Sequence, residues 1–377
     1  MQKNLVFILA FAFISIFMSC QNQFYNKIIK EELSLEKTPE TVASEYFKKI
    51  ESLDSMQTSR AINSSLPSFI ENMEIETATG KSMFVSELPQ EEKEMLYKIW
   101  LEQSISELAK KLSSDEDLLT LVNIENTAFY MTVDNSRSAN NSNFSAEKFL
   151  KKYQKNLSSI TNVYETSRSA SQNKEITKDC LVKNSVDILK ANYKKGYILI
   201  CTDTTSSSAS SFIGHSSMLA FDSWQSVWEE DGLARMTITS YPKNMNAQWE
   251  GKTNGVQLEP IGLWAGNSGG SANKVKLFSV QKEKFVWKWF KLDSVYTPAP
   301  DSDYNSAVEY ARAQIGKPYN LSFIKDVDSA FYCSSLIYKS WRRMSSEYDM
   351  SYPVFWVSPA DIAGSHKTVL VTSFNNK

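Results

Sequence analysis

The stretch FYCSSLIYKSWRR, residues 331–343, is the part of the sequence that decides the fold. It predicts a helix that begins at or just before Cys333 and runs to about residue 344. A thiol at a helix N-terminus faces the positive end of the helix dipole and free backbone N–H groups, and both favour the nucleophilic thiolate. A lone cysteine before an apolar helix is more often a packed, inert thiol. The thiol therefore needs a partner elsewhere in the chain before it indicates chemistry.

The sequence contains only 2 histidines, His215 and His366, and either could serve as the base. His215 follows a serine-rich stretch, residues 204–211, and opens a predicted strand over residues 215–221. A histidine at a strand edge beside a loop is well placed to act as a base, although a hydrogen-bonded structural histidine is the commoner case. His366 follows Cys333 closely in the sequence. We prefer His215, because only His215 combines a strand, a loop and a motif.

Strands and helices come in runs around these residues rather than in strict alternation. Strands are expected over residues 197–201, 215–221, 234–240, 275–280, 285–292 and 369–372. A helix is expected over residues 305–315, closed by Gly316 and Pro318. This order predicts an α+β layer architecture. Alternating Trp and Lys in FVWKWF, residues 285–290, predicts a half-buried sheet face rather than a carbohydrate or membrane contact.

Five motifs together resemble a known family. They are GHSSMLAF (214–221), GVQLEP (255–260), GKPY (316–319), YCSSL (332–336) and SPAD (358–361). Their order is similar to that in the YiiX-like, circularly permuted NlpC-type cysteine hydrolases of the papain fold, in which the His strand precedes the Cys helix. The resemblance covers about residues 190–370. It implies a permuted papain-like domain, with Cys333 as nucleophile and His215 as general base and acid. An amide or ester would be attacked through an acyl-enzyme.

The residue that should orient His215 departs from the family pattern. The family usually has Glu or another strong acceptor on the strand paired with the His strand, and the resemblance places Thr239 there, with Ser240 beside it. A hydroxyl can accept from an imidazole N–H, but it carries no charge to stabilise imidazolium. We therefore expect a weaker base, an acceptor from elsewhere, or a slow or inactive enzyme. The residues 196–198 (Gly-Tyr-Ile) and 335–336 (Ser-Leu) also differ from the family's Gly-Asp-Ile and Glu-Leu.

Three residues near the expected nucleophile are candidates for lining a substrate pocket. Tyr332 and Ser334 flank Cys333 in the sequence, and Tyr319 belongs to the GKPY motif. Tyr319 could bond a substrate carbonyl or could equally pack in the core.

The first residues predict export. Lys3 precedes an apolar run over residues 5–18 that is shorter than the ~20 residues of a membrane span. Residues 17–20, Phe-Met-Ser-Cys, resemble a loose lipobox, with Phe17 in place of the usual Leu. We expect residues 1–19 to be a signal peptide, Cys20 to be lipidated and residues 20–36 to be a tether. The protein would then be lipid-anchored in the cell envelope, on the outer membrane, the periplasmic face or the surface. An ordinary signal peptide with an incidental cysteine is the alternative.

The N-terminal half carries no catalytic constellation. Helices are expected to begin at Thr38, with Pro39 first, to run over residues 89–112, to begin near Ser114 and to run over residues 146–157. A polar loop is expected over residues 135–145. We expect a mainly helical domain over residues 37–175, serving as a spacer, a lid or a partner-binding module. The hydrolase domain would occupy residues 176–377, after a polar boundary at residues 166–174.

Composition excludes several functional classes. The net charge of -2 and the absence of a basic block argue against nucleic-acid binding. With 2 His and 4 Cys and no C-x-x-C spacing, no metal or other cofactor is expected. Cys180 and Cys201 could form a disulfide in an exported protein, although a packed thiol at Cys201 fits equally well.

Three functions fit the sequence. The first is a cell-envelope cysteine amidase or peptidase that acts on peptides, peptidoglycan or N-acyl amides. The second is a thiol-dependent acyltransferase or lipid esterase, and the third is a non-catalytic surface binding lipoprotein that keeps the fold. Beyond a substrate, the expected partner is the membrane, reached through the N-terminal lipid. The oligomeric state is not given by the sequence.

Overall fold

The computed structural model describes residues 37–57, 66–137, 183–201, 215–222, 236–241, 255–261, 274–320, 325–351 and 356–375. The predicted signal peptide, Cys20 and tether lie outside these residues, as do the helix expected over residues 146–157, the boundary at residues 166–174 and Cys180. The lipid anchor, the domain limits and the disulfide therefore stay predictions. No helix within the described ranges is long and apolar enough to span a bilayer.

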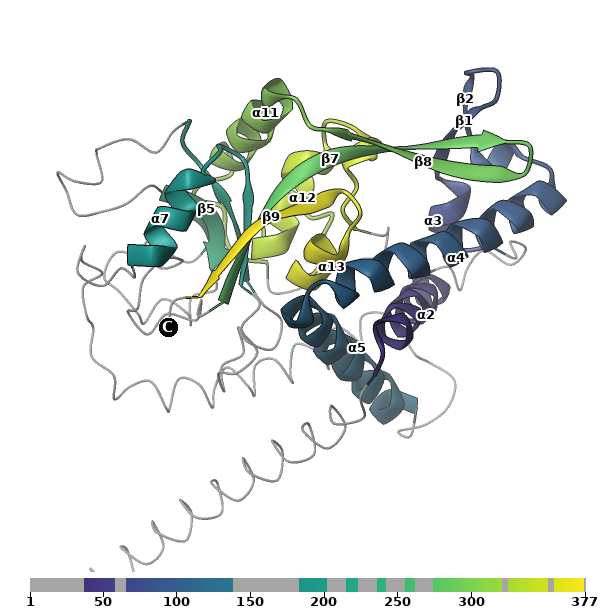
Figure 1. Cartoon of the computed structure of the whole chain (residues 1–377), viewed down its shortest axis with the longest axis horizontal. Coiled ribbons are helices and arrows are strands. Elements are labelled where there is room, and N and C mark those ends of the chain that lie inside the picture. Colours follow the sequence, from purple (N-terminus) through teal and green to yellow (C-terminus); the bar gives the residue numbers. More distant parts are fainter. Residues whose placement is uncertain are drawn as a thin grey trace, which may run out of the picture.

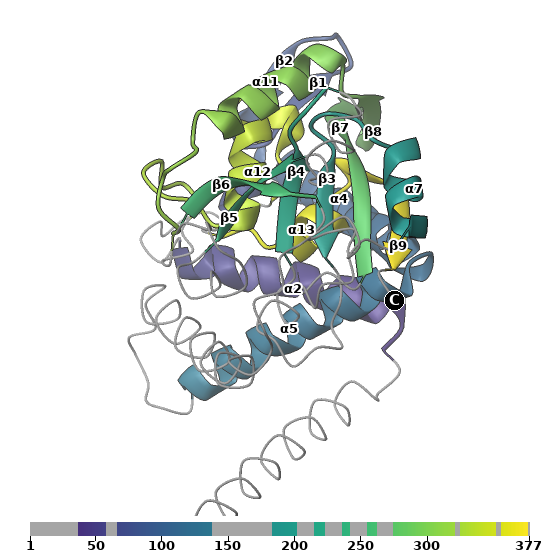
Figure 2. The ribbon, with the colours of Figure 1, turned by 90° about the vertical axis from the view of Figure 1, so that its left-hand side faces the viewer.

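A mixed sheet forms the centre of the molecule (Figures 1 and 2). Its path runs β2-β1-β7-β3-β4-β5-β6, and β8 and β9 also pair with β7. Strands β3 and β4 are buried along their whole length. The strands are β1 (Glu74–Thr77), β2 (Ser82–Phe84), β3 (Ile198–Cys201), β4 (His215–Leu219), β5 (Met236–Tyr241), β6 (Gly255–Pro260), β7 (Lys274–Lys288), β8 (Lys291–Pro298) and β9 (Thr368–Asn375).

Helices cover both faces of this sheet, which explains the burial of its central strands. On β3, Ile198 and Ile200 pack into the core beneath α12, whereas Leu199 and Cys201 join a second core cluster that includes Leu189 of α7. The α+β class is thus confirmed as a mixture of helix and sheet. The helices are α2 (Pro39–Gln57), α3 (Ser68–Glu71), α4 (Gln90–Ser113), α5 (Glu116–Arg137), α7 (Lys183–Ala191), α11 (Asp301–Arg312), α12 (Cys333–Arg342) and α13 (Pro359–Gly364), with 3-10 turns η1 (Val85–Glu87) and η4 (Ser346–Tyr348).

The described part of the N-terminal segment, predicted to be mainly helical, contains helices and two short strands. Helices α2, α4 and α5 begin where they were expected, although α5 continues to Arg137, into the loop predicted from residue 135. Strands β1 and β2 were not predicted, and β1 joins the central sheet by pairing in parallel with β7. The same core cluster contains Trp100 of α4 and Leu336 of α12. The N-terminal helices are therefore packed onto the sheet and its helices.

The strand predicted over residues 285–292 is wrong, because the chain reverses inside it. β7 ends at Lys288, β8 begins at Lys291, and the two-residue turn between them has positive φ at Trp289 (49°) and Phe290 (60°). Two positive φ angles are typical of the type I′ hairpin turn, which normally uses Asn or Gly. No such residue marks this turn. Trp287 is buried as predicted, but Trp289 is 90% exposed, so a core position is wrong for that residue.

Candidate active site

Cys333 is the first residue of α12, as the sequence predicted. The residue before it, Tyr332, is extended, and its backbone N–H donates to Ser335 Oγ at 2.9 Å. This local bond turns the chain into the helix. The first N–H groups of a helix have no carbonyl four residues earlier to bind. The start of α12 therefore surrounds the thiol with backbone donors.

Burial works against the thiolate at this position. Cys333 carries a free thiol and is 7% exposed. Burial raises the pKa of the Cys333 thiol, while the nearby polar groups of the Ser216 and Ser334 backbone and side chains partly offset that rise. The Ser216 hydroxyl lies near the sulfur without a well-aligned hydrogen bond. The ready thiolate expected from the helix start is thus not favoured, because desolvation outweighs the donors.

His215 is the first residue of β4 and is hydrogen-bonded to Thr239 of β5. The Nε2 atom of His215 lies 2.9 Å from Thr239 Oγ1, and both side chains are buried. The Thr239 hydroxyl also donates its single proton to the backbone carbonyl of Ser216, at 3.0 Å. Thr239 Oγ1 must therefore accept the bond from His215, so Nε2 carries a proton. In the neutral ring this leaves Nδ1 as the basic nitrogen.

Ser216 connects this histidine to the thiol. It follows His215 directly, its carbonyl holds Thr239, and its N–H and hydroxyl face Cys333. Sequence reasoning did not single out Ser216, although it lies inside the GHSSMLAF motif. A second bond that was missed runs from Ser240 Oγ to the carbonyl of Phe331, at 2.6 Å, and fastens β5 to the residues before α12. His215 and Thr239 are thus held together at one end of β4, where the next residue, Ser216, lies near the Cys333 sulfur.

Burial, and to a smaller extent the nearby Cys333, raise the pKa of the Tyr319 phenol well above its usual value, which indicates that Tyr319 lies near the thiol. Its position depends on Gly255, whose φ is 112° and whose missing Cβ would lie 2.0 Å from the carbonyl oxygen of Lys317. The close approach of the Gly255 and Lys317 backbones lets the Val256 N–H donate to the Lys317 carbonyl at 2.9 Å. Only glycine allows this contact. The GVQLEP and GKPY motifs therefore belong together, since one holds the other beside α12.

Tyr332 and Ser334 were predicted to line a pocket. Their side chains are instead buried and hydrogen-bonded to the backbone of Val357. The Tyr332 hydroxyl accepts the N–H of Val357 at 2.9 Å, and Ser334 Oγ donates to the Val357 carbonyl at 2.8 Å. The two side chains are 2% and 1% exposed. Side chains so enclosed and already bonded are poorly placed to touch a substrate. They fix the start of α12 to the segment that precedes α13.

That segment is held from its other side by the N-terminal helices. Ser358, the cap of α13, donates to Glu125 of α5 at 2.8 Å. Lys49 of α2 lies 2.9 Å from Glu125 and 3.8 Å from Asp361, all of them buried. Tyr46 donates to Asp361 at 2.8 Å. Burial and the neighbouring Asp361 raise the pKa of Glu125 to about 7, because two acids share one lysine.

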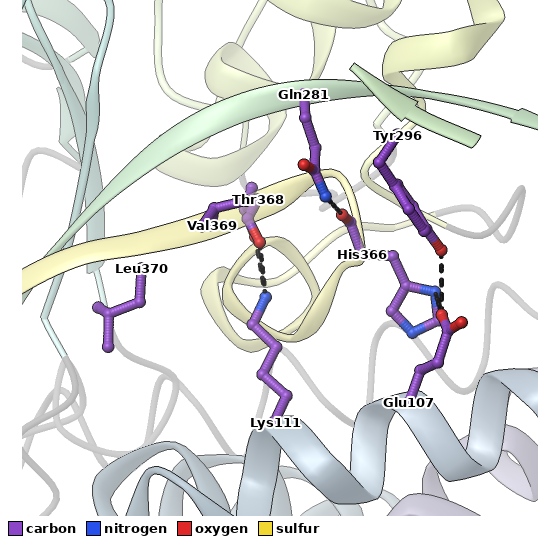
Figure 3. Close-up of a pocket in the computed structure, with 8 residues that line it drawn as sticks. All are labelled: Glu107, Lys111, Gln281, Tyr296, His366, Thr368, Val369 and Leu370. Carbon is purple, nitrogen blue, oxygen red and sulfur yellow. Dashed lines mark hydrogen bonds and ion pairs between the residues drawn. The ribbon is translucent and has the colours of Figure 1, made fainter. Parts of the chain in front are cut away.

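The competing base, His366, lies in a different environment (Figure 3). Its Nδ1 is 3.0 Å from Glu107 of α4 and 4.0 Å from Glu283 of β7. The Tyr296 hydroxyl lies between the two carboxylates, 3.0 Å from Glu107 and 2.8 Å from Glu283, and its single proton can be donated to either one. An open hollow of about 360 Å³ lies beside His366, between α4 and the β7–β9 layer, and its lining residues are Glu107, Lys111, Gln281, Tyr296, His366, Thr368, Val369 and Leu370. His366 is thus part of a charged contact with the N-terminal helices.

Residues 285–355 match the family model described as permuted papain-like amidase enzyme, YaeF/YiiX, C92 family. The resemblance expected from the five motifs is confirmed over these residues. The match includes Cys333 and Tyr319 but neither His215 nor Thr239. A solved structure, the metalloprotein yiiX from Escherichia coli O157:H7, is 15% identical, with a TM-score of 0.29 over 48% of this chain and 97% of that one. No curated protein matches the chain.

Proposed function

We propose that this protein is a cell-envelope cysteine hydrolase, an amidase or peptidase, with Cys333 as nucleophile and His215 as base. The observation that carries the proposal is the hydrogen bond between His215 and Thr239. Thr239 Oγ1 lies 2.9 Å from His215 Nε2 and donates its own proton to the Ser216 carbonyl, so it would receive the Nε2 proton, and Nδ1 would act as the base. Thr239 would act as the positioning residue in place of the carboxylate that such sites usually contain. The family match over residues 285–355 supports the reaction class.

The proposed reaction has two halves. His215 Nδ1 takes the proton of the Cys333 thiol, and the sulfur attacks the substrate carbonyl carbon. The oxyanion formed would be stabilised by N–H groups at the start of α12. His215 then gives its proton to the leaving amine as the C–N bond breaks, which leaves a thioester. A water molecule, deprotonated by His215, attacks the thioester, and its collapse releases the acid and returns the proton to the thiol.

The substrate class follows from the proposed place of the protein. A lipid-anchored protein of the envelope meets peptidoglycan stem peptides, other peptides and N-acyl amides. Each of these presents an amide carbonyl to the thiol. The predicted anchor at Cys20 would hold the hydrolase near such substrates, and the polar residues 21–36 would serve as the tether.

Thiol labelling tests the proposed pair directly. Full-length protein is treated with iodoacetamide between pH 5.5 and 9, and the labelled cysteine is identified by peptide mass spectrometry. Because burial raises the pKa of the Cys333 thiol, labelling near pH 6 requires proton transfer to His215. We expect Cys333 to be labelled there in the wild type and in His366→Ala, but only at alkaline pH in His215→Ala. A wild-type Cys333 that stays unlabelled when folded but is labelled in urea would refute the hydrolase.

The burial of Cys333 also favours one competing function, a non-catalytic binding lipoprotein that keeps the fold. An acyl-enzyme separates the two. Wild-type protein is incubated with peptidoglycan fragments, short peptides and N-acyl amides, with Cys333→Ala as the control. A mass increase on Cys333, with release of the amine, supports hydrolysis. Binding of these fragments without any adduct or product, and equally by Cys333→Ala, supports the binding protein.

A further inference from the structure

The turn between β7 and β8 lies at the end of a long hairpin (Figure 1). It consists of two large aromatic residues, Trp289 and Phe290. Trp289 is 90% exposed and Phe290 is 55% exposed. Both residues are held with positive φ, which side chains other than Asn and Gly rarely adopt. A tryptophan at position 289 stabilises neither the turn nor the core. Strained and exposed aromatic residues therefore point to a role outside the fold.

The hairpin that presents these rings is firmly supported. The Phe290 ring packs edge-on against Trp287, with 6.3 Å between the ring centroids. The Trp287 indole donates to Glu92 of α4 at 3.4 Å, and Gln103 of α4 donates to the Leu292 carbonyl at 2.8 Å. On the other edge, β1 pairs with β7 as far as Trp287. The strands of the hairpin are thus held by α4 and β1. The exposed Trp289 ring can make a contact without any rearrangement of the chain.

Two lysines flank the aromatic pair. Lys288 and Lys291 face each other across the hairpin, next to the turn, and both are exposed. Lys291 is 2.7 Å from Asp293, in a pair open to solvent. Tryptophan is enriched at the level of lipid headgroups, where its ring lies in the apolar layer and its N–H remains hydrated. Lysines beside it are attracted to anionic headgroups, and their long stems let the charge stay in water.

We propose that this aromatic tip, Trp289 and Phe290 between Lys288 and Lys291, inserts into the interface of a bilayer that contains anionic phospholipids. Two side chains on a convex tip are far below the roughly 800 Å² per partner of a stable protein interface. A soft lipid surface accepts such a tip without a matching pocket. A lipid anchor at Cys20 would hold the protein at a bilayer through residues 21–36, whose extended length is at most roughly 55 Å.

Quenching by brominated lipid tests the insertion. Full-length lipidated protein is reconstituted into vesicles of phosphatidylcholine and phosphatidylglycerol, with or without bromine on the acyl chains, and tryptophan emission is recorded. The matched variant is Trp289→Phe, which keeps an apolar ring and loses one of the 9 tryptophans. We expect bromine to remove about one ninth more of the wild-type emission than of the variant's. Lys288→Glu/Lys291→Glu, or vesicles without phosphatidylglycerol, should reduce that difference at least twofold.

Equal quenching of the wild type and Trp289→Phe would overturn the proposal. So would unchanged accessibility of Trp289 to aqueous acrylamide when anionic vesicles are added. Protection of Trp289 by soluble peptidoglycan fragments, or a change of oligomeric state in Trp289→Phe, without quenching by brominated lipid, would assign the tip to another partner and would also refute insertion. Cys333 labelling should be the same in wild type and Trp289→Phe, which shows that the variant remains folded.

Discussion

Two buried polar regions differ in the kind of partner they use. Around Cys333, the contacts are made by neutral groups, with Thr239 on His215 and the serines 216 and 334 near the sulfur. Where the N-terminal helices meet α13 and β9, the contacts involve carboxylates, in the Lys49–Glu125 ion pair and the His366–Glu107 hydrogen bond. A histidine beside a carboxylate looks more like a catalytic pair than a histidine beside a threonine. Here the carboxylate-bound histidine, His366, lies where the N-terminal helices contact β7 and β9, whereas His215 precedes Ser216, whose polar groups lie near the Cys333 sulfur.

The largest expected effect separates the two histidines. His215→Ala should lower kcat/KM on an amide substrate found in the acyl-enzyme assay by at least about 10³-fold, equivalent to about 4 kcal/mol in the barrier, because the proposed base of the thiol is removed. His366→Ala should change kcat/KM by less than about 3-fold. Steady-state kinetics on the folded variants measures both. A comparable loss in His366→Ala would break the contrast and make that histidine the base.

The charged contacts between the N-terminal helices and α13 should instead contribute to the free energy of unfolding. Lys49→Met leaves Glu125 and Asp361 buried without their cation, and breaking such a pair costs about 3–5 kcal/mol in the free energy of unfolding. Urea unfolding measures this loss. The neighbouring Lys48 is exposed, so Lys48→Met should stay within about 0.5 kcal/mol of the wild type. A loss below about 1 kcal/mol in Lys49→Met would show that the N-terminal helices are only loosely attached. If that variant does not fold, Glu125→Gln, which removes the excess acid, should still fold and tests the same network.

More of the neutral region around Cys333 than of the charged region could be predicted from the sequence. Short-range signals placed α12 at Cys333, and the order of the motifs placed Thr239 opposite His215, where the structure has their hydrogen bond. The proton on Nε2 could not be predicted, because it depends on the bond from Thr239 to the Ser216 carbonyl. The contacts of Lys49 with Glu125 and Asp361 join residues far apart in the sequence, which no local pattern reveals. The Trp289–Phe290 turn was missed because it lacks the Asn or Gly that usually marks such a turn.

Thr239 should have a smaller and more specific effect than His215. Thr239→Val keeps the shape of the side chain but removes the acceptor for His215 Nε2–H, so the ring is no longer fixed in its orientation and protonation. We expect kcat/KM to fall about 10- to 100-fold, while Thr239→Ser, which keeps the hydroxyl, should stay within about 5-fold. The labelling profile of Cys333 should move to higher pH in the valine variant alone. Equal rates in the two variants would mean that another group orients His215.

The smallest expected effect concerns the dependence of stability on pH at the His366 hollow. The hydrogen bond from His366 lowers the pKa of Glu107, and the charge of Lys367 helps to lower that of Glu283 despite burial. A carboxyl whose pKa is lowered by folding stabilises the protein above its usual pKa of 4.5, and that contribution is lost as the pH falls below it. Glu107 is partly exposed, so solvent screening limits the cost of Glu107→Gln to about 0.5–1 kcal/mol at pH 7. The unfolding curves of Glu107→Gln and wild type should converge between pH 5 and 3. A difference that persists at pH 3 would mean that packing, and not charge, holds His366 to α4.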